Sequence, residues 1–270
     1  MDSIIEVVRC FENSNIIHVD GVINPINDIE IIELELIYAD LETVSKRRER
    51  VKKQLKADKS LAKEDQILER LEKTLNEGKS ARSIEFTKED KEIIKGLHLL
   101  TLKPLMYVAN VDEETIQDPE SNENFKKVKK YAESQNAKVI PICVKLEEEI
   151  SELESEEEKK EFLEMMGLDK SGLDRLVIAS YDILGLMSYL TAGEVEVRAW
   201  TIRKGTKAPQ AAGKIHSDIE RGFIKAEIVS YDDLIECGSM AKAREKGLIR
   251  MEGKEYTMKE GDIVDFKFNV

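Results

Sequence analysis

The sequence contains no long apolar run and only a few cysteines and histidines. No segment approaches the roughly 18 to 20 consecutive apolar residues of a membrane-spanning helix, and the N-terminus lacks the pattern of a signal peptide. The three cysteines are scattered without a CxxC pair, at Cys10, Cys143 and Cys237. This spacing argues against a zinc site or a disulfide framework, and the three histidines are too dispersed for a metal site. We therefore expect a cytoplasmic protein without a bound structural metal.

The sequence also lacks the motifs of the common hydrolases. The phosphate-binding pattern GxxxxGK[ST] does not occur. Gly78-Lys79-Ser80 imitates only its end, because Lys73 stands where the first glycine is required and the run follows a helical pattern. Asp169 to Gly172 imitates the magnesium motif DxxG but joins two expected helices. GxSxG and HExxH are missing as well, so this chain alone is not expected to hydrolyse a nucleotide.

Charge is abundant and unevenly distributed. Charged residues make up 36% of the chain and the net charge is −13, which argues against coating nucleic acid through bulk charge. Residues 46–56 are nevertheless strongly basic, while residues 147–164 are strongly acidic. The basic run has two readings, a local contact for RNA and an ordinary solvated helix face.

The first third of the chain predicts a strand followed by a helical hairpin. Residues 4–11 are apolar and β-branched, as in a buried strand. A helix follows from a cap at Asn27 or Asp28, and its heptad positions 34, 37, 41, 44, 48, 51 and 55 are apolar except for Arg48. A second helix has leucines at 61, 68, 71 and 75 and ends at Gly78. Together these helices predict an antiparallel coiled-coil arm.

Buried strands then alternate with helices, which is typical of a parallel sheet with crossover helices. Strands are expected at 102–111 and 137–144. Helices are expected from a capping box at Thr87 to about 100, and at 122–135, 155–166 and 173–188. The fold class is therefore α/β, with the arm inserted between strands of one domain.

The pattern changes after Gly193 to short alternating strands at 195–202, 222–229 and 263–270, with a helix at 231–246. This texture is typical of a small β-grasp domain. We expect segments 1–27 and 99–190 to form the α/β domain, 28–98 the helical insertion, and 191–270 the C-terminal domain.

One candidate binding site follows a buried strand. Asn110-Val111-Asp112-Glu113 comes directly after residues 107–109, and ligands of α/β proteins bind at the carboxyl ends of strands. An amide and a carboxylate at this spacing can read a purine edge, as NKxD does in GTPases. Val111 replaces the lysine and Glu113 the aspartate, which disfavours guanine. Val144 and Lys145 end the next strand. The alternative interpretations are an ordinary loop at Asn110 and, at Val144, a plain strand end that joins an acidic helix.

Several stretches together resemble the Obg-like, YchF-type ATPase family. The resemblance rests on residues 7–12 with 15–19, 108–113, 198–202, and above all on Lys204–Gly213 with its continuation 215–218 and 222–227. It implies a Ras-like G domain with a coiled-coil insertion and a C-terminal ubiquitin-like TGS domain. It further implies ATP, bound in preference to GTP, with magnesium, and association with ribosomes or RNA.

The same resemblance suggests roles for individual residues. Asn110, Val111 and Glu113 would contact the adenine, with Val144 and Lys145 closing the pocket. The basic run lies on the expected arm and would meet RNA or the ribosome through Lys46, Arg47, Arg48, Arg50, Lys52 and Lys53.

This sequence departs from the family because the P-loop, both switch segments and the magnesium ligands are missing. We therefore expect a truncated form of an ATPase that keeps the base-recognition half and is inactive alone. The alternative is a non-enzymatic module that binds the ribosome or a protein through its arm and TGS domain.

Overall fold

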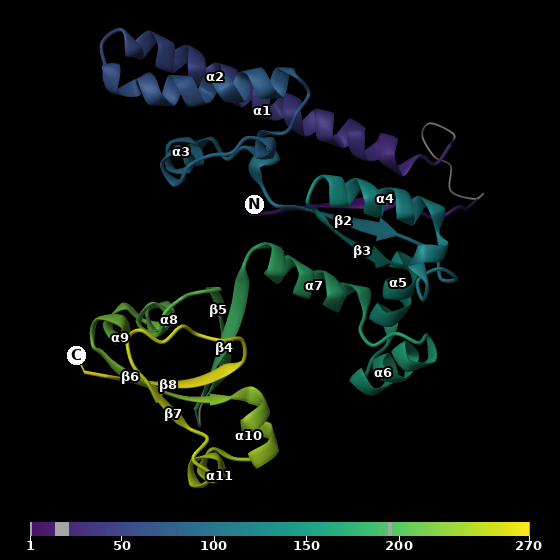
Figure 1. Cartoon of the computed structure of the whole chain (residues 1–270). Helices are drawn as coiled ribbons and strands as arrows, with labels where there is room; N and C mark the ends of the chain where they lie inside the picture. The colour runs from purple at the N-terminus through teal and green to yellow at the C-terminus, as the bar shows by residue number, and fades with distance from the viewer. Residues whose placement is uncertain (1, 14–21, 194–195, 270) are drawn as a thin grey trace. The chain divides into compact units, whose positions relative to one another are not determined.

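The computed structural model describes residues 2–13, 22–193 and 196–269 (Figure 1). The chain forms two compact units, Met1–Ile178 and Ala179–Val270. The stretch at 15–19 that contributed to the family resemblance lies outside the described residues. No helix in the described part of the chain is long and apolar enough to cross a membrane.

The first unit contains a three-stranded parallel sheet in the order β1-β2-β3. Its strands are β1 (Ile4–Arg9), β2 (Leu105–Asn110) and β3 (Lys138–Ile142). Arg9 pairs with Asn110, and Asn110 pairs with Ile142. The central strand β2 is buried along nearly its whole length, as its unbroken apolar sequence predicted. This register brings the carboxyl ends of all three strands together.

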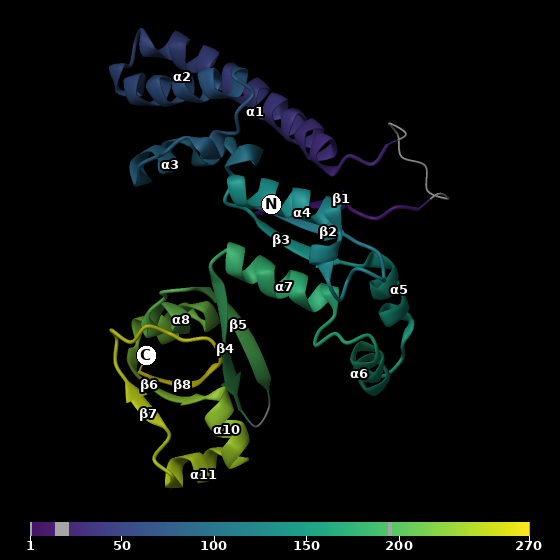
Figure 2. The same cartoon turned by 45° about the vertical axis from the view of Figure 1, so that its right-hand side comes forward.

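Helices follow the second and third strands of this sheet, and the first of them packs against β2 and β3. They are α4 (Glu123–Ser134), α5 (Val144–Glu152), α6 (Glu156–Met165) and α7 (Gly172–Ile183), with the short 3₁₀ turn η5 (Pro119–Ser121) before α4. Asn122 caps α4 by accepting from the Phe125 N–H at 2.9 Å, and its Nδ2 donates to the Cys10 carbonyl at 3.0 Å. The Asn122 side chain thereby joins the crossover helix to the residue that follows β1. Figure 2 shows α4 lying along β2 and β3.

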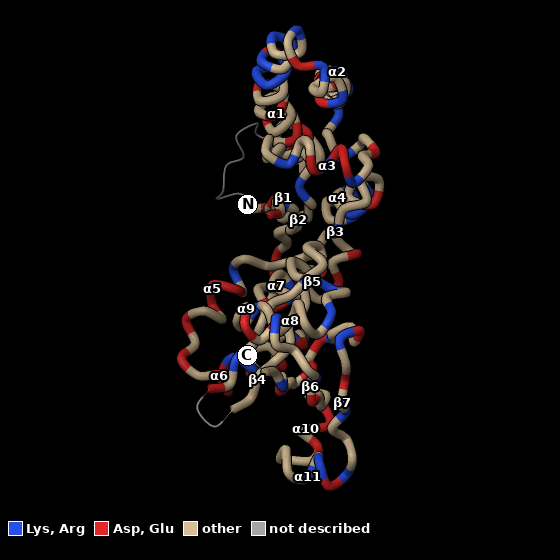
Figure 3. The backbone as a smooth tube through the Cα atoms, turned by 90° about the vertical axis from the view of Figure 1, so that its left-hand side faces the viewer, with Lys and Arg blue, Asp and Glu red and all other residues tan. Residues whose placement is uncertain are grey.

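Two antiparallel helices, α1 (Pro25–Leu55) and α2 (Ala62–Asn76), form the predicted hairpin through η1 (Lys59–Leu61). The α1 cap is Asn24, and Pro25 starts the helix, so the predicted cap at Asn27 or Asp28 is wrong. Proline has no N–H to lose at the first helical position. Figure 3 shows many of the lysines and arginines near the turn between the helices.

Arg48, the one polar residue predicted among the heptad positions, lies within the apolar contact between α1 and α2. The buried residues of this contact are Ile37, Val44, Val51, Leu68, Leu71 and Leu75. Arg48 lies among them with only 11% of its side chain exposed, and pairs with Asp65 at 3.4 Å, Glu72 at 2.5 Å and Glu69. Because a charge inside an apolar contact must be paired, this network favours one register of the two helices.

The segment after the hairpin is shorter and more broken than its sequence predicted. Thr87 and Asp90 form the expected capping box. The regular helix α3 (Lys88–Ile94) then stops, and the 3₁₀ turns η3 (Lys95–Leu97) and η4 (Leu100–Leu102) follow. His98 between these turns has φ +51°, a left-handed conformation that ends the helical run. A further turn, η2 (Ala81–Ser83), links α2 to this segment.

A buried carboxylate joins α1 to the segment that leads into β2. Asp40, only 2% exposed, accepts from the N–H groups of Leu100 and Thr101, each at 2.7 Å, and from the Thr101 hydroxyl at 2.6 Å. The Thr101 hydroxyl oxygen in turn accepts from the Ala81 N–H at 2.9 Å. These bonds satisfy backbone groups that are shielded from water and fix the hairpin on the sheet.

The second unit contains a five-stranded mixed sheet in the order β5-β4-β8-β6-β7. The strands are β4 (Leu186–Ala192), β5 (Val197–Arg203), β6 (Phe223–Ser230), β7 (Arg250–Glu252) and β8 (Asp262–Phe268). The β4–β8 pair is parallel, and the other pairs are antiparallel. The helix expected at 173–188 is wrong after Ile183, because Gly185 turns the chain with φ +62° into β4. The C-terminal sheet therefore includes residues before the expected boundary at 191.

Two apolar clusters cover this second sheet. Helices α8 (Ala208–Ile215) and α9 (Ser217–Arg221) lie with one cluster, and α10 (Tyr231–Cys237) and α11 (Met240–Glu245) with the other. The single helix expected at 231–246 is wrong, since Gly238 interrupts it with φ +73°. Alternate residues of β6 enter different clusters, Ala226 and Ile228 one, Val229 the other.

Replacing Asp40 by Ala is expected to destabilise the first unit by about 3 kcal/mol, because two buried backbone N–H groups and a hydroxyl lose their acceptor. Urea unfolding followed by far-UV circular dichroism measures the change. Glu35→Ala removes an exposed carboxylate from the same helix and should cost less than about 0.5 kcal/mol. A loss at Asp40 no larger than that of the control would contradict the proposed role.

A second expectation concerns Glu6 on β1. Burial, followed by the nearby charge of Glu33, raises its pKa to about 7 from the ordinary 4.5. Its folded state therefore keeps a proton that the unfolded chain has already lost. The resulting stability is fully present below about pH 4.5 and is lost as the pH rises through 7.

Between pH 5 and pH 7.5 we expect Glu6 to remove about 1–2 kcal/mol of stability, less than the full linkage value because the side chain is only half-buried. Glu6→Gln should flatten this part of the stability profile, whereas Glu49→Gln, an exposed glutamate on α1, should not. Urea titrations at several pH values make the comparison. Identical profiles for wild type and Glu6→Gln would be incompatible with a raised pKa.

Candidate functional site

The loops that follow β1, β2 and β3 surround a cavity of about 470 Å³. Parallel pairing places these loops at one end of the sheet, where α/β proteins bind ligands. The residues lining the cavity are Phe11, Glu12, Asn13, Asn110, Val111, Asp112, Glu113, Cys143, Val144, Lys145 and Glu148. The cavity thus brings together Asn110, Val111, Glu113, Val144 and Lys145, which the sequence predicted as neighbours of a base.

Asn110 connects the two loops of the predicted site. Its Oδ1 accepts from the Val144 N–H at 3.2 Å, so the amide oxygen is already occupied. Its Nδ2 has no protein partner among the described residues, and an amide nitrogen can only donate. Asn110 can therefore offer two N–H donors to a ligand acceptor while it holds the start of α5.

Glu113 and Lys145 face each other at the rim of the cavity. Lys145 Nζ donates to Glu113 Oε2 at 2.9 Å, and its hydrogen bond with this carboxylate raises the pKa of Lys145. The two side chains are 39% and 65% exposed. An ion pair this exposed adds little stability, so the Glu113 carboxylate can accept from a ligand with little loss.

Apolar residues form other parts of the wall. Val111 is only 1% exposed, packs with the core of the first unit, and donates its N–H to the Ile142 carbonyl at 2.9 Å. Phe11 is half-buried, and the Arg9 guanidinium carbon lies 4.7 Å from its ring centroid. Cys143 is buried, which raises its pKa and keeps its thiol neutral. Phe11, the half-buried member of this group, can offer apolar surface to a flat ligand.

Asp112 has a local role within the loop. Its Oδ1 accepts from both the N–H and the hydroxyl of Thr115, at 2.9 and 2.7 Å. This turn occupies the carboxylate oxygen and braces the segment between Asn110 and Glu113.

Sequence reasoning missed several lining residues, chiefly Phe11, Glu12, Asn13 and Glu148. The first three follow β1, which was recognised as a buried strand but not considered as a contributor to the site. The same rule that singled out Asn110, that strand ends carry ligand contacts, would have identified them. Glu148 follows one helical turn after Val144 on α5, where such spacing brings side chains to one face.

The predicted RNA contacts lie on α1 and do not line this cavity. Arg48 is enclosed by three carboxylates of α2, which leaves little of it for a partner. Lys46 pairs with Glu42, and Arg47 Nε pairs with Glu64 at 2.6 Å. Arg50, Lys52 and Lys53 make no ion pair within the described part of the chain.

Within residues 2–13, 22–193 and 196–269, no group of His, Cys, Asp or Glu side chains is arranged to hold a metal ion. The cavity offers donors on Asn110, an acceptor on Glu113 and apolar wall on Phe11 and Val111. This set can bind a planar heterocycle that carries an acceptor beside an amino group.

Comparisons with known proteins agree along the whole chain. The family model YchF-GTPase_C, described as "Protein of unknown function (DUF933)", matches residues 186–269. A protein of Bacillus subtilis (strain 168) named "Ribosome-binding ATPase YchF" is 55% identical over all of this chain, which covers 74% of that protein. The protein of the same name in Escherichia coli O157:H7 is 45% identical over all of this chain and 73% of its own length.

A solved structure gives the same result for the fold. The Schizosaccharomyces pombe YchF GTPase matches 98% of this chain and 72% of its own with a TM-score of 0.81 and 39% identity. The fold is therefore the α/β fold of this YchF GTPase, with helices and both parallel and mixed sheets. Because the whole of this chain aligns with the Bacillus subtilis protein at 55% identity, the chain belongs to the YchF family.

Proposed function

We propose that this chain binds the base of an adenine nucleotide in the cavity at the ends of β1, β2 and β3. The observation that carries the proposal is the meeting of Asn110, Glu113 and the apolar residues Phe11 and Val111 around one space of about 470 Å³. The names of the relatives, an ATPase and a GTPase, support a nucleotide as the ligand. Val144 and Lys145 close the cavity on the α5 side.

Hydrogen-bond complementarity favours adenine over guanine. Adenine presents the acceptor N7 beside the donor N6 amine, whereas guanine presents two acceptors, N7 and O6. The free Asn110 amide can donate to N7 and the Glu113 carboxylate can accept from the amine. Bound through the same edge, guanine would place O6 against the carboxylate, which leaves two acceptors facing each other and one of them desolvated.

The residues of this cavity are not expected to bind the phosphates of ATP or the magnesium ion that accompanies them. GxxxxGK[ST] does not occur in this sequence, and backbone amides of that loop are what cradle the phosphates. We therefore expect the 270-residue chain to bind the base weakly and not to hydrolyse ATP by itself. Magnesium would be held through the phosphates rather than by the residues around Asn110.

The finer architecture is part of the same proposal. The parallel sheet of the first unit is interpreted as part of a Ras-like G domain, and the α1–α2 hairpin as its coiled-coil insertion. The C-terminal sheet, matched by the family model over residues 186–269, is interpreted as a TGS domain of the β-grasp type. Support comes from the crossover helix between β2 and β3 and from the mixed order of the second sheet.

Ribosome association is proposed from the printed names of the relatives in Bacillus subtilis and Escherichia coli. It would place the protein in the cytoplasm, as its sequence led us to expect. The hairpin with its basic run is the part of the first unit that we expect to meet RNA or the ribosome. The cavity at the ends of β1, β2 and β3, called the purine cavity below, favours a nucleotide-dependent protein. A plain binding module would have no need of such a cavity.

Titration with AMP and GMP, followed by nuclear magnetic resonance to millimolar concentrations, tests base binding directly. Wild type should bind AMP several-fold more tightly than GMP, and Asn110→Ala should weaken AMP binding about tenfold, equivalent to about 1.4 kcal/mol. Glu113→Gln should reduce the preference for AMP. Glu114→Gln changes an exposed neighbour outside the cavity and should leave both affinities within about twofold. Equal binding of AMP by wild type and Asn110→Ala would refute the proposal.

Pelleting with purified ribosomes through a sucrose cushion tests the association. Wild type is expected to pellet at low salt and to be released as salt increases, because phosphate contacts are screened. Asn110→Ala should pellet as well as wild type when no nucleotide is present. If added ATP changes the amount of neither protein in the ribosome pellet, the binding-module alternative is favoured. If wild type does not pellet with ribosomes at all, the proposed association is contradicted.

A further inference from the structure

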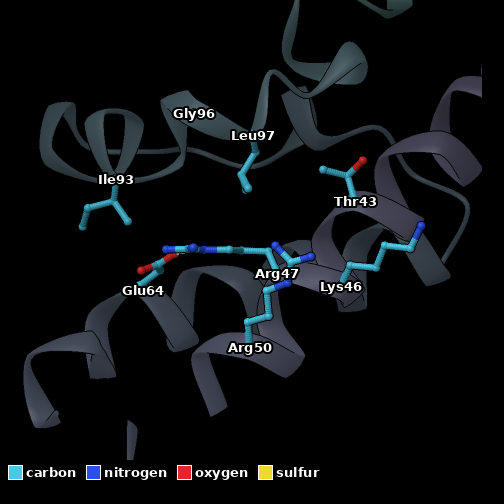
Figure 4. A pocket seen from close by; sticks show the side chains of 8 residues that line it. All are labelled: Thr43, Lys46, Arg47, Arg50, Glu64, Ile93, Gly96 and Leu97. Carbon is cyan, nitrogen blue, oxygen red and sulfur yellow. Dashed lines mark hydrogen bonds and ion pairs between the residues drawn. The ribbon is translucent and has the colours of Figure 1, made fainter. Parts of the chain in front are cut away.

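A second cavity, of about 490 Å³, lies in the helical part of the first unit, away from the strand ends. Its lining residues are Thr43, Lys46, Arg47, Arg50, Glu64, Ile93, Gly96 and Leu97. They come from α1, α2 and the segment formed by α3 and η3 (Figure 4). Sequence reasoning noted the basic residues of α1 but not the opposite wall, because residues 93–97 are distant in sequence and carry no motif.

Three cations line one side of this cavity. Arg47 is held by the Nε bond to Glu64, whose side chain is only 13% exposed, and its terminal nitrogens have no protein partner in the described part of the chain. Arg50 makes no ion pair there either. Lys46 pairs with Glu42, but both side chains are 68% exposed, so this contact is weak and easily exchanged.

The other side of the cavity is apolar and open. Ile93 and Leu97 are partly buried against the apolar residues of the hairpin. Gly96 between them leaves space, since a Cβ added there would meet nothing within 4 Å. The nearby acidic residues Glu89 and Glu92 do not line the cavity and are already paired with lysines, Lys63 and Lys95. An anion entering here meets guanidinium groups on one side and an apolar wall on the other.

We propose that this cavity binds a phosphate group through Arg47, Arg50 and Lys46. Planar guanidinium groups match the oxygens of phosphate with paired N–H donors, and the Glu64 carboxylate fixes one of them in advance. The phosphate can come from the backbone of RNA or from a free polyphosphate. The RNA source rests on the proposed ribosome association, whereas the site itself does not depend on the purine cavity.

The first arm of the test measures binding of a fluorescein-labelled single-stranded RNA of 12 nucleotides by anisotropy. The double variant Lys46→Gln/Arg50→Gln should bind at least tenfold more weakly than wild type. Its slope of log affinity against log salt should be shallower by about 1.4, because each of the two lost phosphate contacts removes about 0.7 on single strands. The matched control Lys59→Gln/Lys73→Gln removes two exposed charges from the same hairpin, outside both the cavity and the basic run 46–56, and should change the affinity no more than threefold.

The second arm measures inorganic pyrophosphate by isothermal titration calorimetry. Suppose that the two variants bind RNA equally well, but only Lys46→Gln/Arg50→Gln loses pyrophosphate binding. The site then binds a free polyphosphate rather than RNA. Equal RNA losses in both variants, without such selective loss of pyrophosphate, would mean diffuse charge and would overturn the site. Absence of binding by wild type in both arms would overturn it as well.

The purine cavity provides an internal control for both arms. The variant Lys46→Gln/Arg50→Gln should bind AMP like wild type, because neither residue lines that cavity, and unchanged AMP affinity also shows that the first unit is folded. Asn110→Ala should bind RNA and pyrophosphate like wild type. Failure of base binding and failure of phosphate binding are therefore seen in different measurements.

Discussion

Parallel hydrogen bonding between β1, β2 and β3 is the constraint on which the candidate base site depends. Arg9, Asn110 and Ile142 are aligned across the three strands, although Arg9 and Asn110 are 101 positions apart in the chain and the hairpin lies between them. Parallel strands all end on the same side, so the loops after them must meet. The bond from the Val144 N–H to Asn110 Oδ1 then fixes the distance between two of these loops.

The long insertion between β1 and β2 requires a rigid attachment, and a few buried polar groups provide it. Asp40 bonds two backbone N–H groups and the Thr101 hydroxyl just before β2, while Tyr131 on α4 donates to Glu33 on α1 at 3.0 Å. Apolar packing alone would tolerate small slips of α1 along the sheet. Directional bonds in a dry environment do not, because each slip would leave a buried donor unpaired.

The sequence predicted those features that a local pattern determines. Apolar runs predicted β1, β2 and β3, and the capping boxes at Thr87 and Ser155 are present in the structure. The residues chosen around Asn110 from a strand-end rule lie around one cavity. What failed depended on tertiary context or on single backbone positions: the strand after Gly185, the helix break at Gly238, and the contribution of Phe11. The three partners of Arg48 were equally unforeseeable, because they lie on α2 and only the hairpin brings them to it.

Net charge is a poor guide to where this chain can meet an anion. At −13 the whole molecule repels phosphate at long range, but a Debye length of about 8 Å at physiological salt limits that effect to near neighbours. Within this distance, the attraction for an anion depends on which cations are already paired with carboxylates. Arg48 is the most thoroughly paired residue of the basic run and the least available, whereas Arg50 has no ionic partner in the described part of the chain. The capacity of the arm to bind an anion is therefore set by its internal ion pairs, which select a few cations from a run that looks uniform in the sequence.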